Sequence, residues 1–317
     1  MIKLSNGHEF EYMVASGALA FDGKGWLWER PLVWLGLIKP ELFTVVIKTL
    51  TLHPRKGNLR WWKPWECVSL IPGGSVNKIG LTNKGIRWWC ENIGWNIDYQ
   101  KYPTVGSIFG DQDELVEMAE ILNSFDFVAL EVNPSCPNTG HSFQTTEDII
   151  KMVKAVKKIS FHPIIVKVSV DQDIVAIANG LEGVAEAVSL NSVPWKTAYK
   201  NGEITPLWKL EEKVGGGGGG VSGKPAQKFN WAAVNKLAVH SHSMPIIGPS
   251  VMKYEDMETV RRAGARAVSF GAIHLAEYPV WLRPWSIFTQ PCKPTRFVQR
   301  EKEEQKKRKE KHEPKTN

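Results

Sequence analysis

One cysteine in this chain stands between two carboxamide side chains, on a loop that proline stiffens. The segment Glu131-Val-Asn133-Pro-Ser-Cys136-Pro-Asn138 follows an apolar run, residues 127–130, that is typical of a buried strand. Proline on each side of the Ser-Cys pair restricts the backbone and removes two N–H donors. A thiol held rigidly at a strand end can act as an acid or base, and the two amides can bind a flat, amide-rich ring. A loop cysteine without a role is the alternative that this segment alone leaves open.

Lysine and asparagine side chains end other apolar runs of the chain. Lys48 ends Val-Val-Ile, Lys167 ends Ile-Ile-Val, and Asn191 follows Val-Ser-Leu. A charge at the end of an apolar strand is costly to bury without a partner, so we expect each lysine to face a polar ligand. A lysine that extends to solvent at the rim is the alternative. With Asn133 and Cys136, these residues predict a site for a flat, hydrogen-bonding, anionic group.

Eight strand-like apolar runs alternate with amphipathic stretches, which is typical of a parallel β/α architecture. We expect strands at residues 12–15, 43–48, 104–108, 127–132, 163–168, 185–190, 245–248 and 267–270. Helical spacing is clearest at residues 113–124, 146–159, 231–239 and 254–263. Because eight parallel strands can close into a barrel, we predict an α/β protein, a (β/α)8 TIM barrel.

Two long insertions interrupt the alternation, at residues 49–79 after the second strand and 192–225 after the sixth. Loops that follow strands lie on the catalytic face of such a barrel, so we expect these inserted loops at the C-terminal face, as a lid or substrate wall. The second insertion contains six consecutive glycines, Gly215–Gly220. Their conformational freedom permits either a flexible linker or a backbone surface against a ligand.

Composition sets the class of the protein. A chain of 317 residues with 43% hydrophobic content suits one large globular domain, which we place at residues 1–295. The four cysteines are far apart and form no C-x-x-C pair, which favours a reducing, cytoplasmic location and argues against a metal or iron–sulfur site. No apolar run approaches the roughly 18 residues that span a bilayer, so no membrane association is expected.

The basic charge is concentrated at the C-terminal end. Residues 296–317 contain nine Lys/Arg against five Glu, which is +4 of the net charge of +7. This tail has no apolar face, so we expect a frayed helix or disorder. The body is almost neutral, which argues against nucleic-acid binding as its function. Several of the fourteen tryptophans cluster at residues 26–28, 61–65 and 88–89, and they suggest a lid, a partner surface or aromatic core packing.

The loop around Cys136 resembles the active-site loop of dihydroorotate dehydrogenases. Six further blocks resemble the family in its order along the chain: Ala15-Ser16-Gly17, Lys48 with Arg55–Asn58, Asn77–Asn83, Val166–Val168 with Asn191-Ser192, Gly220–Gly223 and Ala263–Gly271. The resemblance covers about residues 9 to 290. It implies FMN bound at the mouth of the barrel, with dihydroorotate or orotate stacked on the flavin ring.

The resemblance also implies a role for individual residues. Residues that would contact FMN are Ala15, Ser16, Gly17, Lys48, Asn133, Lys167, Gly223, Gly248, Ser250 and Gly271. Residues that would hold the substrate are Asn77, Ile79, Gly80, Leu81, Asn133, Asn138, Asn191 and Ser192. Cys136 would be the base that takes the C5 proton as hydride leaves C6, and Lys167 would favour negative charge on the reduced flavin.

Cysteine rather than serine at position 136 resembles the class 1 enzymes, which implies a homodimer and, in class 1B, an electron-transfer subunit with FAD and an iron–sulfur cluster. One departure concerns the phosphate of FMN. The family usually has a Gly-Gly pair after strand seven, whereas this chain has Gly248-Pro249-Ser250. Proline removes a donor there, and the Ser250 hydroxyl could restore one. Two related reductases, dihydropyrimidine dehydrogenase-like and tRNA dihydrouridine synthase-like, and a flavin-free binding scaffold remain alternatives.

Overall fold

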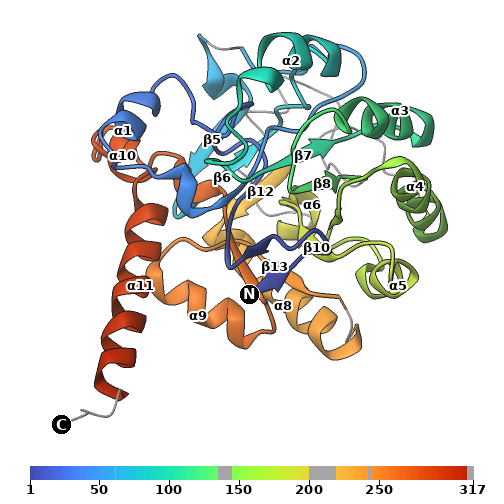
Figure 1. Cartoon of the computed structure of the whole chain (residues 1–317). Coiled ribbons are helices and arrows are strands. Elements are labelled where there is room, and N and C mark those ends of the chain that lie inside the picture. The colour runs from blue at the N-terminus through green and yellow to red at the C-terminus, as the bar shows by residue number, and fades with distance from the viewer. Residues whose placement is uncertain (61, 135–144, 200–218, 242–243, 313–317) are drawn as a thin grey trace.

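The fold is a closed barrel of eight parallel strands with helices around it (Figure 1). It is described by a computed structural model that covers residues 1–60, 62–134, 145–199, 219–241 and 244–312. The barrel strands, in chain order, are β3 (Tyr12–Val14), β4 (Thr44–Val46), β7 (Thr104–Ile108), β8 (Ala129–Val132), β9 (Ile164–Val168), β10 (Ala187–Leu190), β13 (Ile246–Gly248) and β14 (Ala267–Phe270). All eight predicted strands are confirmed, and the α/β barrel with them.

Each barrel strand pairs with its neighbours in parallel register. Val14 lies opposite Val45, Val46 opposite Val105, and Val268 opposite Tyr12 where the last strand closes on the first. These strands are buried on both faces, the inner face in the barrel and the outer face under the helices. This double burial explains why they are continuous apolar runs rather than alternating ones.

The helices cover the outside of the barrel. The α-helices are α1 (Arg30–Trp34), α2 (Ile86–Asn92), α3 (Gln112–Leu122), α4 (Thr146–Ile159), α5 (Ile174–Gly180), α6 (Trp195–Ala198), α8 (Lys224–His240), α9 (Tyr254–Arg262), α10 (Ser286–Thr289) and α11 (Lys293–His312). Short 3-10 helices are η1 (Pro40–Leu42), η2 (Pro64–Glu66), η3 (Gly94–Asn96) and η4 (Ala272–His274). Reciprocal capping hydrogen bonds, Asp111 with Glu114 and Thr145 with Asp148, start α3 and α4.

The two insertions combine into one antiparallel sheet at the C-terminal face. The first contributes β5 (Val68–Ile71) and β6 (Gly74–Asn77), and the second contributes β11 (Val193–Pro194) and β12 (Gly220–Gly223). The strand order is β11-β12-β6-β5, so β12 and β6 join the insertions. The predicted wall therefore exists as a sheet. Of the glycine run, Gly220 begins β12, while residues 215–218 lie outside the described residues.

A short N-terminal hairpin, which the sequence interpretation missed, closes the other end of the barrel. Its strands are β1 (Ile2–Lys3) and β2 (Glu9–Phe10). Ile2, Leu4 and Phe10 are buried in the same apolar cluster as the residues inside the barrel. The two-residue strands carry too little alternation to be recognised from the sequence.

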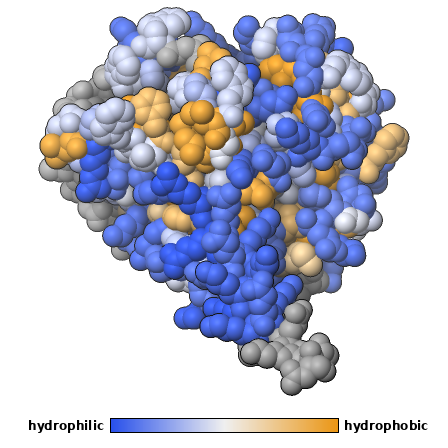
Figure 2. All heavy atoms as spheres, turned by 60° about the vertical axis from the view of Figure 1, so that its left-hand side comes forward, coloured by the Kyte–Doolittle hydropathy of each residue, from blue (hydrophilic) through white to orange (hydrophobic). Residues whose placement is uncertain are grey.

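Of the two states predicted for the C-terminal tail, a frayed helix and disorder, the structure has the helix, because α11 is continuous as far as His312. Val298 is fully buried against the outer core, and Glu301 pairs with Arg261 of α9 and accepts a hydrogen bond from Tyr12 at 2.9 Å. Glu304 accepts from the Tyr254 hydroxyl at 2.8 Å. The helix is anchored mainly by polar contacts to other elements, so the tail needs no apolar face of its own. Residues 305–311 of the helix are exposed and hydrophilic (Figure 2).

The described helices include none that is both long and apolar enough to cross a lipid bilayer.

Candidate active site

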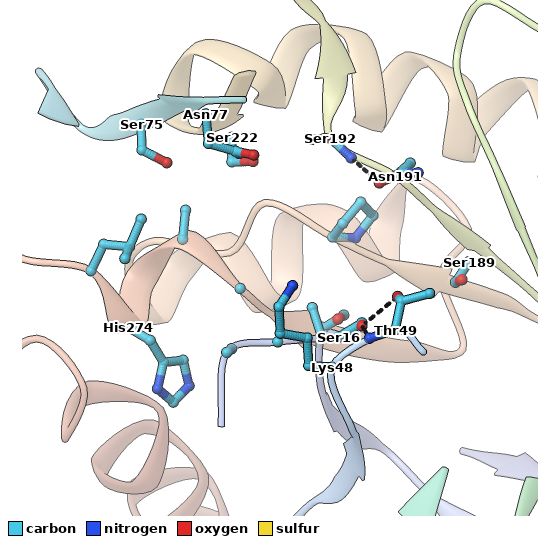
Figure 3. A pocket seen from close by; sticks show the side chains of 18 of the residues that line it. Ser16, Lys48, Thr49, Ser75, Asn77, Ser189, Asn191, Ser192, Ser222 and His274 are labelled. Atoms are coloured by element: carbon cyan, nitrogen blue, oxygen red, sulfur yellow. Dashed lines mark hydrogen bonds between the residues drawn. The ribbon is translucent and has the colours of Figure 1, made fainter. Parts of the chain in front are cut away.

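A cavity of about 300 Å³ opens at the C-terminal mouth of the barrel. Strand ends and the loops that follow them form its floor and sides, and the antiparallel sheet forms the facing wall. Figure 3 shows Ser75, Asn77 and Ser222 of this sheet opposite Lys48 and Ser16. The volume is at the lower end of the range of about 300–1,000 Å³ that is usual for ligand pockets.

The interior of the barrel changes from apolar to polar within two residues along most strands. The lower inward-facing layer is one apolar cluster, with one residue from each strand: Met13, Val46, Val105, Ala129, Ile165, Ala187, Ile247 and Ala267. Two residues further along, on the same face, are Ala15, Lys48, Ser107, Glu131, Lys167, Ser189, Pro249 and Ser269. The apolar layer fills the barrel, and the layer above it provides a mainly polar floor for the cavity.

The asparagines that follow two strands come together at this floor. Asn133 follows β8 and Asn191 follows β10, and the Asn191 amide donates to the Asn133 side-chain oxygen at 3.2 Å. Asn77 lines the same cavity from β6 on the facing sheet. The structure thus brings these three amides to one cavity, where they offer donors and acceptors on opposite sides of one space.

Both strand-end lysines are buried and line the cavity, with exposed fractions of 8% for Lys48 and 7% for Lys167. The Lys167 Nζ lies 3.2 Å from Oε1 of Glu131, which is 1% exposed. The alternative of a lysine extended into bulk solvent is therefore wrong for both. The sequence predicted that Lys167 faces a polar ligand; the structure shows that it also has a carboxylate partner within the chain, Glu131.

The loop after the first strand forms a further side of the cavity. Gly17 has a φ of +83°, which favours glycine, and the Lys48 side chain passes 3.7 Å from the position of a Cβ there. The Trp26 Nε1 donates to the Gly17 carbonyl at 3.1 Å, and the Trp26 ring stacks on Trp28 with centroids 5.6 Å apart. Both rings line the cavity, so this tryptophan pair belongs to the site.

Most of the predicted site residues line this one cavity. They are Ala15, Ser16, Gly17, Lys48, Asn77, Ile79, Leu81, Asn133, Lys167, Asn191, Ser192, Gly223, Ser250 and Gly271. Two others, Gly80 and Gly248, are not among its lining residues. Cys136 and Asn138 lie outside the described residues.

The two glycines outside the lining serve the backbone and the packing. A Cβ on Gly248 would lie 2.5 Å from Val260 and 2.7 Å from Ala265, so this glycine allows α9 to approach β13 closely. Gly80 has a φ of +70° and turns the chain between Ile79 and Leu81. Both positions therefore favour glycine for reasons that do not involve a ligand.

Helix α8 presents an unsatisfied polar atom at the cavity, next to the loop after β13. Ser250 has a φ of +67°, and its hydroxyl accepts a hydrogen bond from the Asn230 amide at 2.9 Å. The other amide atom of Asn230 is buried without a hydrogen-bond partner among the described residues. Because the Ser250 hydroxyl can donate or accept, the Asn230 amide can present either its oxygen or its NH₂ group to the cavity.

His274 adds two more such atoms. It lines the cavity from η4 (Figure 3), its Nδ1 lies 3.7 Å from Oε1 of the buried Glu29, and neither ring nitrogen has a hydrogen-bond partner among the described residues. Buried polar groups in proteins are normally hydrogen-bonded. The unsatisfied atoms of Asn230 and His274 therefore fit a ligand with a strongly polar or anionic group.

Sequence reasoning missed several side chains of the site, among them Glu131, Ser189, Asn230, His274 and Trp26. Glu131 and Ser189 precede Asn133 and Asn191 by two residues, so the period of two in a strand would have placed them on the same inner face. Trp26 was noted only as part of a cluster. No signal in the sequence points to His274, which lies in an irregular loop.

The described residues offer no cluster of metal ligands, and burial suppresses the ionisation of two of their thiols. There, no three His, Cys, Asp or Glu side chains come close enough together to hold a metal ion. Burial raises the pKa of Cys67 to about 11, against the opposing effect of Lys48, and burial also raises the pKa of Cys90 to about 11. These thiols stay protonated near neutral pH.

Comparisons with known proteins agree on one family. The family model described as dihydroorotate dehydrogenase matches residues 33–283. Proteins named "Dihydroorotate dehydrogenase B (NAD(+)), catalytic subunit" are similar to this chain: that of Bacteroides fragilis is 29% identical over 75% of this chain and 78% of its own length. Those of Geobacillus kaustophilus (32%; 74% and 74%) and Brachyspira hyodysenteriae (33%; 73% and 76%) are comparable. This chain belongs to the dihydroorotate dehydrogenase family.

Proposed function

We propose that this chain oxidises dihydroorotate to orotate, a reaction of pyrimidine biosynthesis, with bound FMN as the hydride acceptor. The observation that carries the proposal is the convergence of Asn77, Asn133 and Asn191 with the buried Lys167 on one cavity at the barrel mouth. The family membership supports the same reaction.

The polar groups of the cavity suit the substrate. The dihydroorotate ring has amide donors and acceptors along its edge and carries a carboxylate. The three asparagine amides can pair with such an edge from facing walls, since each amide both donates and accepts. The backbone around Ile79 and Leu81 lies at the same wall. A substrate analogue without the carboxylate would leave buried donors unpaired, which costs roughly 1–3 kcal/mol for each group.

The lining residues also fit FMN. When bound, FMN supplies the two-electron hydride chemistry that no side chain provides. Lys48, Lys167 and the loop Ala15–Gly17 would hold its ring and ribityl chain. Gly223, Ser250 and Gly271 would surround its phosphate, where the unsatisfied Asn230 and His274 atoms provide polar partners. Ser250 keeps the left-handed backbone that glycine usually supplies, so the departure from the Gly-Gly pair leaves the turn intact.

Cys136 is the residue that we propose as the base. Its thiolate would remove the C5 proton of dihydroorotate while hydride leaves C6, and the asparagines would hold the ring in place. The residue follows Asn133, which lies at the cavity, by three positions. A thiol with an ordinary pKa near 8.5 makes the rate of this step rise with pH.

An anaerobic titration tests the proposal. The purified protein should be yellow from bound flavin, and dihydroorotate should bleach that colour, whereas dihydrouracil, which lacks the carboxylate, should not. A colourless protein that gains no colour when FMN is added would support the flavin-free scaffold instead. Equal bleaching by both compounds would support a dihydropyrimidine reductase, and bleaching only by dihydrouridine in tRNA would support the third alternative.

We also propose the route of the electrons and the setting of the protein. The relatives are named as NAD(+)-type catalytic subunits, so we propose a partner subunit with FAD and an iron–sulfur cluster as the electron acceptor, and a homodimer of this chain. The described cysteines, Cys67, Cys90 and Cys292, are unpaired, which supports a reducing compartment such as the cytoplasm.

A further inference from the structure

Glu131 is the most deeply buried charged residue of the cavity floor, and both of its carboxylate oxygens are engaged. Oε1 lies 3.2 Å from the Lys167 Nζ and accepts a hydrogen bond from the Ser107 hydroxyl at 3.0 Å. Oε2 accepts from the Ser189 hydroxyl at 3.1 Å. These partners come from β9, β7 and β10, so one carboxylate connects three other strands of the barrel.

The hydrogen-bond network continues from Glu131 toward the loop after the first strand. Thr49 Oγ1 lies 2.9 Å from Ser107 Oγ, and Ser16 Oγ lies 2.9 Å from Thr49 Oγ1. An ionised carboxylate only accepts, so Ser107 must give its single proton to Glu131 and accept from Thr49. The Ser107 and Thr49 hydroxyls therefore both point toward Glu131. Ser16 ends the network, because its single proton can go either to Thr49 or to the Ile47 carbonyl, which lies 2.9 Å from Ser16 Oγ.

The barrel does not require a charge at this level for stability. One layer below, eight apolar side chains fill the interior completely. Replacing a buried ion pair by apolar groups of similar volume is often neutral or stabilising, so an ion pair is weak as a device for stability alone. Glu131 and Lys167 both line the cavity, which places the pair where it acts on a bound molecule.

We propose that Glu131 is a positioning residue for the oxidation: it holds the Lys167 ammonium at the cavity floor and offsets its charge, and so sets the electrostatic environment of the bound flavin. This inference rests on the proposed function, because it assumes a flavin in the cavity. It assigns to Glu131 a role that acts through Lys167, with no contact of its own to the reacting atoms.

The midpoint potential of the bound flavin is the readout. Glu131→Gln keeps the shape of the side chain but removes the negative charge that offsets Lys167 at 3.2 Å, which favours the more negative, reduced flavin. We expect the potential to rise by about 30 mV or more, which corresponds to about a tenfold change in the two-electron equilibrium constant. Lys167→Met should lower the potential, because it removes the positive charge.

The double variant distinguishes positioning from an independent effect of the Glu131 charge. Once Lys167 is methionine, no ammonium remains for Glu131 to hold, so a residue that acts only through Lys167 has nothing left to position. Adding Glu131→Gln to Lys167→Met should therefore leave the potential unchanged within about 10 mV, roughly twofold in the equilibrium constant. This comparison stands even if Glu131→Gln alone does not fold, because the double variant contains no unpaired charge.

Glu186→Gln is the matched control, since Glu186 also has serine and lysine contacts, to Ser5 and Lys157, but precedes β10 at the opposite end of the barrel. It should not shift the potential. Equal shifts from Glu131→Gln in the presence and absence of Lys167, or a potential unchanged by Glu131→Gln in a yellow, folded protein, would overturn the inference. A colourless wild-type protein that does not take up FMN would instead contradict the proposed function, so the two failures differ.

Discussion

One substitution, Val298→Ala, tests whether α11 packs against the outside of the barrel. Val298 lies in the first half of α11 and is fully buried in the outer core. Val298→Ala removes two buried carbon atoms at about 0.8 kcal/mol each, and a small cavity remains. We therefore expect a loss of about 2 kcal/mol in the free energy of unfolding. A disordered tail would predict no loss, because the side chain would be solvated in both states.

Urea unfolding followed by tryptophan fluorescence measures this difference. Gln305→Ala is the matched control, since residue 305 is exposed on the same helix and should change the free energy of unfolding by less than about 0.5 kcal/mol. Truncation after Glu304 should also leave the free energy of unfolding unchanged, because residues 305–311, which it removes from the helix, are exposed. A Val298→Ala variant as stable as the wild type would refute the docking of α11.

Three further outcomes follow from the site. Cys136→Ser should retain the flavin but slow flavin reduction by dihydroorotate at pH 7 by at least about a hundredfold, since general-base catalysis contributes about 10²–10⁴-fold. Stopped-flow absorbance measures this rate, and an undiminished rate would exclude Cys136 as the base. Lys167→Met should lower the free energy of unfolding by about 3–5 kcal/mol, because it strands a buried carboxylate, and Glu131→Gln added to it should restore most of that loss. The more exposed Lys157→Met should cost less than about 1 kcal/mol, and similar losses at both lysines would contradict the buried pair. At pH 8, Cys67 should react with a thiol reagent far more slowly than a free thiol, because its pKa of about 11 leaves roughly one thiolate in a thousand. Mass spectrometry measures the labelling of Cys67, and rapid labelling would contradict its burial.

Local patterns were sufficient for the elements of the barrel. The strands are buried on both faces, so each is a short apolar run that can be recognised without knowledge of its neighbours. The helix at Thr146–Ile159 was predicted with its observed bounds, because its apolar spacing is regular. The two-residue strands of the N-terminal hairpin were missed, since so short a segment has no period to recognise.

The candidate site was predicted in part for the same reason. Lys48, Lys167, Asn133 and Asn191 each end an apolar run, and strand ends converge at one face of a barrel whatever the length of chain between them. The pairing of Lys167 with Glu131 could not be read in this way, because it joins residues 36 positions apart. It depends on the neighbouring positions of β8 and β9 in the closed sheet.

The sequence by itself determined the parallel barrel, the face that carries the site and the family-like loop around Cys136, because these depend on residue type and on periods of two and 3.6 along the chain. Only the tertiary structure decided which side chains touch. It joined the two insertions in one sheet, packed α9 closely against Gly248 of β13, and anchored α11 through Glu301 and Glu304. Each of these outcomes depends on distances between segments far apart in the chain, which no local pattern of residues contains.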